Sequence, residues 1–200
     1  MRLGVFGGTF DPVHYGHLLL AEQCREQCRL DQVWFVPAYQ SPHKQDHEPT
    51  SGKIRCELLE YALAGAPWFA INRLELDRGG PSFTVETLQT LHAEEPSREL
   101  FLLIGADSLA DFPKWREPLR ILELATLVVV NRGRNPPPVE ATIETLGNSL
   151  RDRIVTVEMP AVDLSASDIR QRATAGRSLR FMTPRAVEEA IRLSGVYSRK

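Results

Sequence analysis

Near its N-terminus the chain reads Gly7-Gly8-Thr9-Phe10-Asp11-Pro12-Val13-His14-Tyr15-Gly16-His17, directly after a short apolar run at residues 3–6. Paired glycines let the backbone turn sharply and approach a ligand closely, because no Cβ stands in the way. An amphipathic stretch, residues 16–30, follows and predicts a helix. The N-terminus of a helix presents unpaired N–H groups and the positive end of its dipole, and both attract phosphate.

The two histidines of this stretch reinforce that interpretation. His14 and His17 are three residues apart, so on one helical turn they point the same way. Gly16 between them leaves the start of the helix open. We therefore predict a phosphate cradle (residues 7–17) with two imidazole donors. The stretch contains neither the G-x-G-x-x-G dinucleotide fingerprint nor the Gly-Lys-Ser/Thr of a P-loop.

Outward from the cradle, short apolar runs alternate with amphipathic stretches along the chain. Strands are predicted at residues 3–6, 33–36, 69–76, 100–104, 127–130 and 154–157. Helices are predicted at residues 16–30, 51–65, 84–93, 139–150, 167–175 and 183–194, and residues 196–200 as a tail. This order predicts an α/β fold, a doubly wound parallel sheet with helices on both faces. Ligands of such sheets bind where strand C-termini meet helix N-termini.

Composition limits the class of protein. With 200 residues and 42% hydrophobic residues, we expect a single domain at 1–200, with C-terminal helices from about residue 165 packed on it. A formal charge of −2 provides no global field to recruit nucleic acid. The apolar runs are too short to span a membrane, and the three cysteines cannot all pair. We expect a soluble cytoplasmic protein; its oligomeric state stays open.

A second candidate phosphate site lies near the C-terminus, where the chain reads Leu164-Ser165-Ala166-Ser167-Asp168-Ile169-Arg170. A serine-rich turn that enters a helix offers amides and hydroxyls to phosphate, and Arg170 adds a forked cation. Taken alone, the segment fits equally a serine that caps a helix and an arginine on a solvated face.

The first stretch resembles the signature of the T/H-x-G-H nucleotidyltransferase superfamily, here His14-Tyr15-Gly16-His17. The second resembles the superfamily's C-terminal signature, I-S-S-T-x-I-R, with Ala166 in place of a hydroxyl residue and Ser167 in place of threonine. This resemblance implies a Rossmann-like fold and the transfer of a nucleoside monophosphate from a nucleoside triphosphate.

Further segments are similar to the bacterial nicotinate mononucleotide adenylyltransferases. They are Pro42-His43-Lys44, residues 80–88, residues 103–109 and Phe112-Pro113-Lys114-Trp115. The resemblance implies that ATP and nicotinate mononucleotide are joined to give deamido-NAD and pyrophosphate in NAD biosynthesis, with Mg²⁺ entering with ATP. Because Mg²⁺ would bind ATP oxygens and mostly water, we expect no dedicated carboxylate cage and name no protein ligand for the metal.

Site residues follow from the motifs and from this resemblance. The expected catalytic residues are His14, His17, Lys44 and Arg170. The expected ATP-binding residues are Gly7, Gly8, Thr9, Phe10, His14, Gly16, His17, Gly105, Asp107, Ser165, Ser167 and Arg170. Nicotinate mononucleotide is expected at Gly8, Thr9, Lys44, Thr84, Trp115 and Arg134. Thr84 fits equally a helix cap, and Trp115 a partly buried core residue.

Two alternatives remain. Pantetheine-phosphate adenylyltransferase, or another member of the superfamily, shares the first motif. A protein of another class, a histidine-rich metal-binding module, would use His14, His17, His43 and His47, since the first pair has helical ligand spacing.

Overall fold

A computed structural model describes residues 1–42, 49–131 and 137–198 of the chain. Within these ranges the core is one parallel sheet with the strand order β3-β2-β1-β4-β5-β6. The strands are β1 (Arg2–Gly8), β2 (Gln32–Pro37), β3 (Phe69–Ile71), β4 (Glu99–Gly105), β5 (Ala125–Asn131) and β6 (Ile154–Glu158). The predicted doubly wound α/β fold is confirmed.

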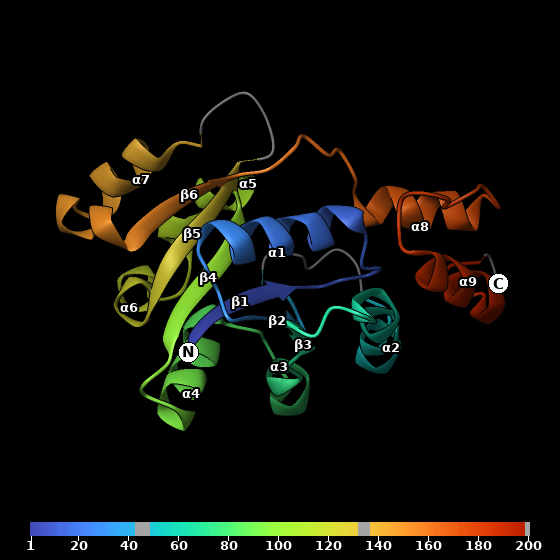
Figure 1. The fold of residues 1–200 in the computed structure, drawn as a ribbon, viewed down its shortest axis with the longest axis horizontal. Helices are drawn as coiled ribbons and strands as arrows, with labels where there is room; N and C mark the ends of the chain where they lie inside the picture. The colour runs from blue at the N-terminus through green and yellow to red at the C-terminus, as the bar shows by residue number, and fades with distance from the viewer. Residues whose placement is uncertain (43–48, 132–136, 199–200) are drawn as a thin grey trace.

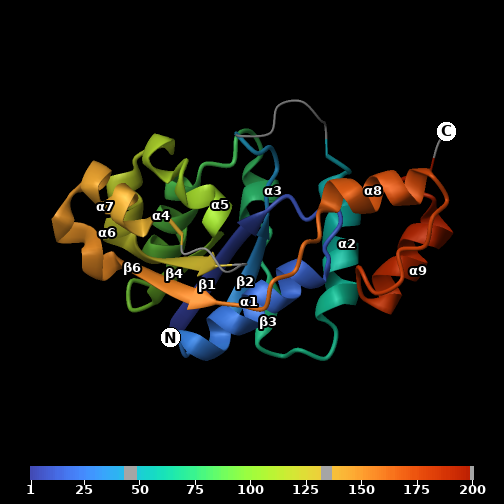
Figure 2. The same ribbon diagram turned by 90° about the horizontal axis from the view of Figure 1, so that it is seen from above.

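Helices cover both faces of the sheet (Figure 1). One face carries α1 (Tyr15–Gln27) and α2 (Gly52–Leu63), and α8 (Ala166–Thr174) and α9 (Arg185–Ser194) share the core cluster of these two helices. The other carries α4 (Thr84–Glu94), α5 (Ala106–Leu109), the 3₁₀ turn η1 (Phe112–Lys114), α6 (Pro118–Leu124) and α7 (Val139–Leu146). Figure 2 shows α8 and α9 beside α2, at the end of the molecule opposite α7.

Strand β4 explains why the strands read as continuous apolar runs. Its Phe101 and Leu103 belong to the core under α1, whereas Leu100, Leu102 and Ile104 belong to the core under α4. Side chains of a strand alternate between faces, so a strand buried on both sides shows no polar alternation.

The strand order places two turns together. Because β1 lies between β2 and β4, the chain winds outward from β1 in opposite directions on its two sides. The turn after β1 and the turn after β4 therefore meet at the carboxyl edge, where the topology reverses and such sheets bind ligands. The phosphate cradle lies at this switch point.

Two element predictions are wrong in part. The strand predicted at residues 69–76 ends at Ile71, and α3 (Leu74–Arg78) follows, because Asn72 accepts a hydrogen bond from the Leu74 N–H through Oδ1 and starts the helix. The helix predicted at 139–150 stops at Leu146, since Gly147 has a φ of 119°. A 3₁₀ segment, η2 (Asn148–Arg153), continues from there to β6.

The C-terminal tail prediction is also wrong for part of its length. Helix α9 packs against α2, and Tyr197 beyond it is 8% exposed within the core on the α1 side. The cysteines are free and buried as small core residues, and burial raises the pKa of the Cys24 and Cys28 thiols. Among the described residues, no helix is both long and apolar enough to cross a membrane.

Candidate active site

His14 and His17 form a stacked pair at the entrance of α1. His14 is the N-cap residue in an extended conformation, and its backbone N–H donates to Nδ1 of His17 at 3.3 Å. The two rings lie 3.7 Å apart, centroid to centroid, with an interplanar angle of 22°. The helix start thus holds both imidazoles in one orientation, as the three-residue spacing predicts.

Two aromatic side chains, Phe10 and Phe6, pack against the ring of His17. Phe10 contacts it edge-on at 5.1 Å between centroids, and Phe6 lies 6.1 Å away. The Phe10 side chain is 1% exposed, and its φ is 50°, a left-handed conformation that non-glycine residues rarely adopt. Phe10, one of the predicted ATP-binding residues, is therefore almost wholly covered by the protein, backbone included.

The glycine between the histidines is required by the His14 ring. A Cβ at Gly16 would lie 3.0 Å from both Cε1 and Nδ1 of His14. We expect Gly16→Ala to push this ring aside and to lower kcat by about tenfold, since catalytic groups must be held to a fraction of an ångström. Steady-state kinetics and circular dichroism check this; unchanged kcat in a folded variant would contradict it.

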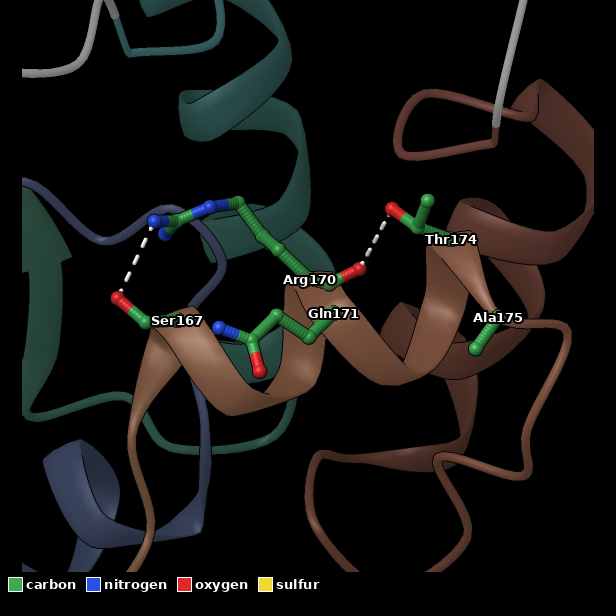
Figure 3. A pocket seen from close by; sticks show the side chains of 5 residues that line it. All are labelled: Ser167, Arg170, Gln171, Thr174 and Ala175. Carbon is green, nitrogen blue, oxygen red and sulfur yellow. Dashed lines mark hydrogen bonds between the residues drawn. The ribbon is translucent and has the colours of Figure 1, made fainter.

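The second motif contacts the first one directly. The Ser165 hydroxyl caps α8 by accepting a hydrogen bond from the Asp168 N–H, as predicted for a serine that enters a helix. Arg170, however, does not extend into solvent: its Nη1 donates to the Asp11 carbonyl at 2.6 Å and its Nη2 to Ser167 Oγ. Figure 3 shows the guanidinium reaching away from the helix toward the first turn, beside a pocket of about 440 Å³. This pocket is lined by Ser167, Arg170, Gln171, Thr174 and Ala175 and not by the histidines.

The N-terminus of α4 is a second open helix end. Thr84 is its first helical residue, and Phe83 in the N-cap position makes no side-chain cap bond, so Thr84 is not the cap. The segment before it joins the carboxyl edge of the sheet, where Ser82 N–H donates to the Gln40 carbonyl and Ser82 Oγ accepts from Tyr39 N–H. The first N–H groups of such a helix lack intrahelical acceptors and suit a carboxylate.

Trp115 and a cation that the sequence analysis missed lie next to this helix end. Trp115 is half-buried and packs against Phe112 at 5.4 Å between centroids. The guanidinium of Arg116 sits 4.6 Å above the Phe83 ring and pairs with Glu86 at 2.9 Å. No sequence signal links residue 116 to residue 83, because only the tertiary fold brings α4 and η1 together.

The remaining predicted residues divide into two groups. Gly105 ends β4 and Asp107 is exposed on α5, both at the carboxyl edge beside the first turn. Lys44 and Arg134 lie outside the described residues, and so do His43 and His47 of the metal-site alternative. Within the described ranges no three His, Cys, Asp or Glu residues cluster as a metal site.

Arg55, Asp11 and Tyr197 complete the surroundings of the cradle and were not predicted. Arg55 is 1% exposed, and burial lowers its pKa, while the Asp11 carboxylate acts in the opposite direction. One signal for it exists in the sequence: Arg55 shares a helix face with Leu58, Leu59 and Ala62 and interrupts an apolar stripe.

The sequence is similar to known proteins of one family. A profile of the cytidylyltransferase-like family matches residues 5–172. The chain is 44% identical over 199 residues to the "probable nicotinate-nucleotide adenylyltransferase" of Thermomicrobium roseum, covering 98% of this chain and 91% of that one. It is also 44% identical over 197 residues to a protein of the same description from Thermus thermophilus, covering 98% of this chain and 100% of that one.

Solved structures agree on the fold. The Plasmodium falciparum nicotinic acid mononucleotide adenylyltransferase complexed with NaAD aligns with a TM-score of 0.78 at 16% identity, over 98% of this chain and 97% of that one. A putative nicotinate-nucleotide adenylyltransferase from Vibrio parahaemolyticus aligns with a TM-score of 0.71 at 19% identity, over 100% and 98%. At these identities the likeness concerns the fold alone.

Proposed function

The chain belongs to the nicotinate-nucleotide adenylyltransferases, nucleotidyltransferases of NAD biosynthesis, and on this premise we propose how its own residues carry out the reaction. A 5′-phosphate oxygen of nicotinate mononucleotide forms a bond to the α-phosphorus of ATP. The bond from that phosphorus to the oxygen bridging to the β-phosphorus breaks, and pyrophosphate leaves with the electron pair. The entering phosphate is already largely ionised, so no protein nucleophile is needed.

The stacked histidine pair is the observation that supports this proposal best. His14 and His17 direct their imidazoles to the α- and β-phosphates of ATP at the topological switch point. The amides of residues 8–10 hold the entering phosphate, and Gly7 and Gly16 leave room for both. Preorganised donors of this kind stabilise charge that develops in the transition state.

Other residues neutralise the leaving group and hold the adenosine. Arg170, with Ser165 and Ser167 at the start of α8 beside it, neutralises the departing pyrophosphate, and Lys44 is assigned the same role from the sequence. Gly105 and Asp107, at the end of β4, hold the nucleoside of ATP, because an acid at this edge commonly accepts from ribose hydroxyls.

The nicotinate ring binds between α4 and η1. The open helix end at Thr84 accepts the carboxylate, Trp115 covers the pyridine ring, and Arg134 contributes a cation to the same substrate. The contact of Arg116 with Phe83 and Glu86 supports this pocket, since it joins the two segments that would form it.

Mg²⁺ is proposed to arrive with ATP, held by phosphate oxygens and water. When bound, it neutralises phosphate charge. The donors around the cradle are imidazoles, amides and arginines, which suit the triphosphate rather than a bare cation. The residues around the cradle therefore fit a metal ion that arrives bound to the phosphates of ATP.

We further propose that residues 1–200 form one nucleotidyltransferase domain that works in the cytoplasm. The C-terminal helices support a single domain, since Ile169, Val187 and Ile191 share a core cluster with Val13 and Leu20. The net charge of −2 supports a small-molecule partner rather than nucleic acid.

A coupled assay that follows pyrophosphate tests the reaction. ATP is offered with nicotinate mononucleotide, nicotinamide mononucleotide, phosphopantetheine and glycerol phosphate. We expect pyrophosphate release with the pyridine mononucleotides alone. Release with phosphopantetheine would favour the alternative assignment within the superfamily, and stoichiometric zinc without turnover would favour the metal-binding alternative.

Arg170 is the residue of the second motif on which we place a prediction. We expect Arg170→Ala to raise the KM for ATP and to lower kcat by roughly tenfold or more, because one charge-assisted donor is lost. Ala166→Ser, which restores the hydroxyl of the usual motif, should be tolerated. Steady-state kinetics with varied ATP measure both effects.

The matched control is Arg172→Ala on the same helix, since the Arg172 guanidinium donates to the Ser178 carbonyl, away from the first turn. If Arg170→Ala leaves ATP saturation and turnover at the level of this control, Arg170 has no part in the site.

A further inference from the structure

The turn after β1 is held from its carbonyl side by three residues distant in the sequence. Arg55 Nη1 donates to the Thr9 carbonyl at 2.7 Å, and Arg170 Nη1 donates to that of Asp11. Thr183 Oγ1 donates to the Val13 carbonyl at 2.9 Å. In the part of the chain that the structure describes, the N–H groups of Thr9 and Phe10 have no hydrogen-bond partner. The carbonyls are thus committed to the protein, and the amide of the partly exposed Thr9 stays available to a ligand.

The side chain of Asp11 anchors the same turn to the end of the chain. Its Oδ1 accepts from the Tyr197 hydroxyl at 2.6 Å, and its Oδ2 accepts from the Thr50 N–H at 3.1 Å. The Tyr197 carbonyl in turn accepts from Thr174 Oγ1 on α8 at 2.8 Å. Burial raises the pKa of Tyr197 far above its usual value, so its hydroxyl is a neutral donor throughout the working pH range.

Arg55 joins three backbone segments with one guanidinium. Besides Thr9, it donates to the carbonyls of Thr50 and Ala38, both at 2.7 Å. Burying an arginine whose hydrogen-bond partners are neutral carbonyls costs desolvation, and an apolar side chain in its place would leave these three carbonyls without their donor. Its planar fork is the feature that an apolar residue cannot replace, because it sets the relative positions of three carbonyls.

We propose that Tyr197 and Arg55 are positioning residues of the phosphate cradle. They hold the carbonyl side of the turn, Tyr197 through Asp11 and Arg55 through the backbone, so that the Thr9 amide and the N–H groups at the start of α1 face the reacting phosphates. Neither side chain touches substrate. The inference rests on the proposed role of these amides. It means that Tyr197, just after α9, positions the backbone that binds phosphate.

The test compares Tyr197→Phe with Thr142→Val. Each substitution removes one hydroxyl from a buried site, but Thr142 donates to the Pro138 carbonyl on α7, at the opposite end of the molecule (Figure 1). We expect Tyr197→Phe to lower kcat about tenfold and to change the KM of either substrate by less than about twofold, because small misplacements reduce the chemical step. Thr142→Val should keep kcat within about twofold of the unmodified protein.

The kinetics of an Arg55 variant and the hydrogen exchange of the turn test the same positioning role independently. Arg55→Lys retains the charge without the fork, so we expect a loss of kcat similar to that of Tyr197→Phe. Hydrogen exchange at residues 13–18, where the Tyr15 N–H donates to the Met182 carbonyl, should be faster in Tyr197→Phe than in Thr142→Val.

A kcat for Tyr197→Phe within twofold of that for Thr142→Val would overturn the proposal, whatever the melting temperatures. A change confined to the KM for ATP would overturn it too, because that would assign Tyr197 to nucleotide binding. Failure of the proposed function is a separate result, since the unmodified protein would then not turn over nicotinate mononucleotide. In that case the hydrogen-exchange rates would still show whether Tyr197 holds the turn after β1.

Discussion

We expect His17→Ala to lower kcat by about a hundredfold or more, the loss typical of removing one preorganised donor to a transition-state charge. The effect should exceed that of an ordinary hydrogen bond for a structural reason. The His17 ring stacks on that of His14 at 3.7 Å and accepts the His14 N–H, so its removal also frees the second imidazole. Single-turnover and steady-state rates at saturating substrates measure the loss.

His92→Ala is the matched control, because His92 is an exposed histidine near the end of α4, away from the carboxyl edge. We expect it to retain the parent kcat. The melting temperature of each variant separates loss of folding from loss of catalysis. A His17→Ala rate within about threefold of the parent, roughly 0.6 kcal/mol, would remove His17 from the catalytic residues.

The second large effect concerns the choice between two mononucleotides. Nicotinate carries a carboxylate where nicotinamide carries a neutral amide, and the open end of α4 at Thr84 offers N–H donors. The nicotinamide NH₂ would face one of these donors, and such an unpaired contact costs about 1–3 kcal/mol. We therefore expect the acid to be preferred roughly ten- to a hundredfold in kcat/KM. Parallel assays with both mononucleotides measure this ratio.

A substitution at Arg116 tests whether the preference for nicotinate comes from this positive charge or from the N–H groups at the start of α4. Arg116 places a positive charge beside the pocket, but Glu86 already pairs with it at 2.9 Å. We expect Arg116→Ala to keep most of the preference, whereas Trp115→Ala should raise the KM for the mononucleotide much more than that for ATP. Equal use of both mononucleotides by the unmodified protein, or an unchanged mononucleotide KM in Trp115→Ala, would contradict this pocket.

Local pattern determined the parts of the fold that depend on local chemistry. Continuous apolar runs such as that of β4 predict strands covered on both faces, and their alternation with helical stretches predicts the doubly wound sheet. The glycine-rich turn and the spacing of His14 and His17 predict a cradle at a helix start, since both are effects within one turn of backbone. These predictions needed no contact between distant residues.

Tertiary structure alone decided which distant groups complete the site. Tyr197 was predicted in a tail, yet its hydroxyl reaches Asp11 across 186 residues of chain. The sequence left Arg170 either at a phosphate site or on a solvated face, and its bond to the Asp11 carbonyl brings the guanidinium to the first turn. Arg116 meets Phe83 only because α4 and η1 pack on the same face of the sheet. The physical reason is that a local pattern reports which side chains are buried, whereas the fold decides which partner each buried polar group meets.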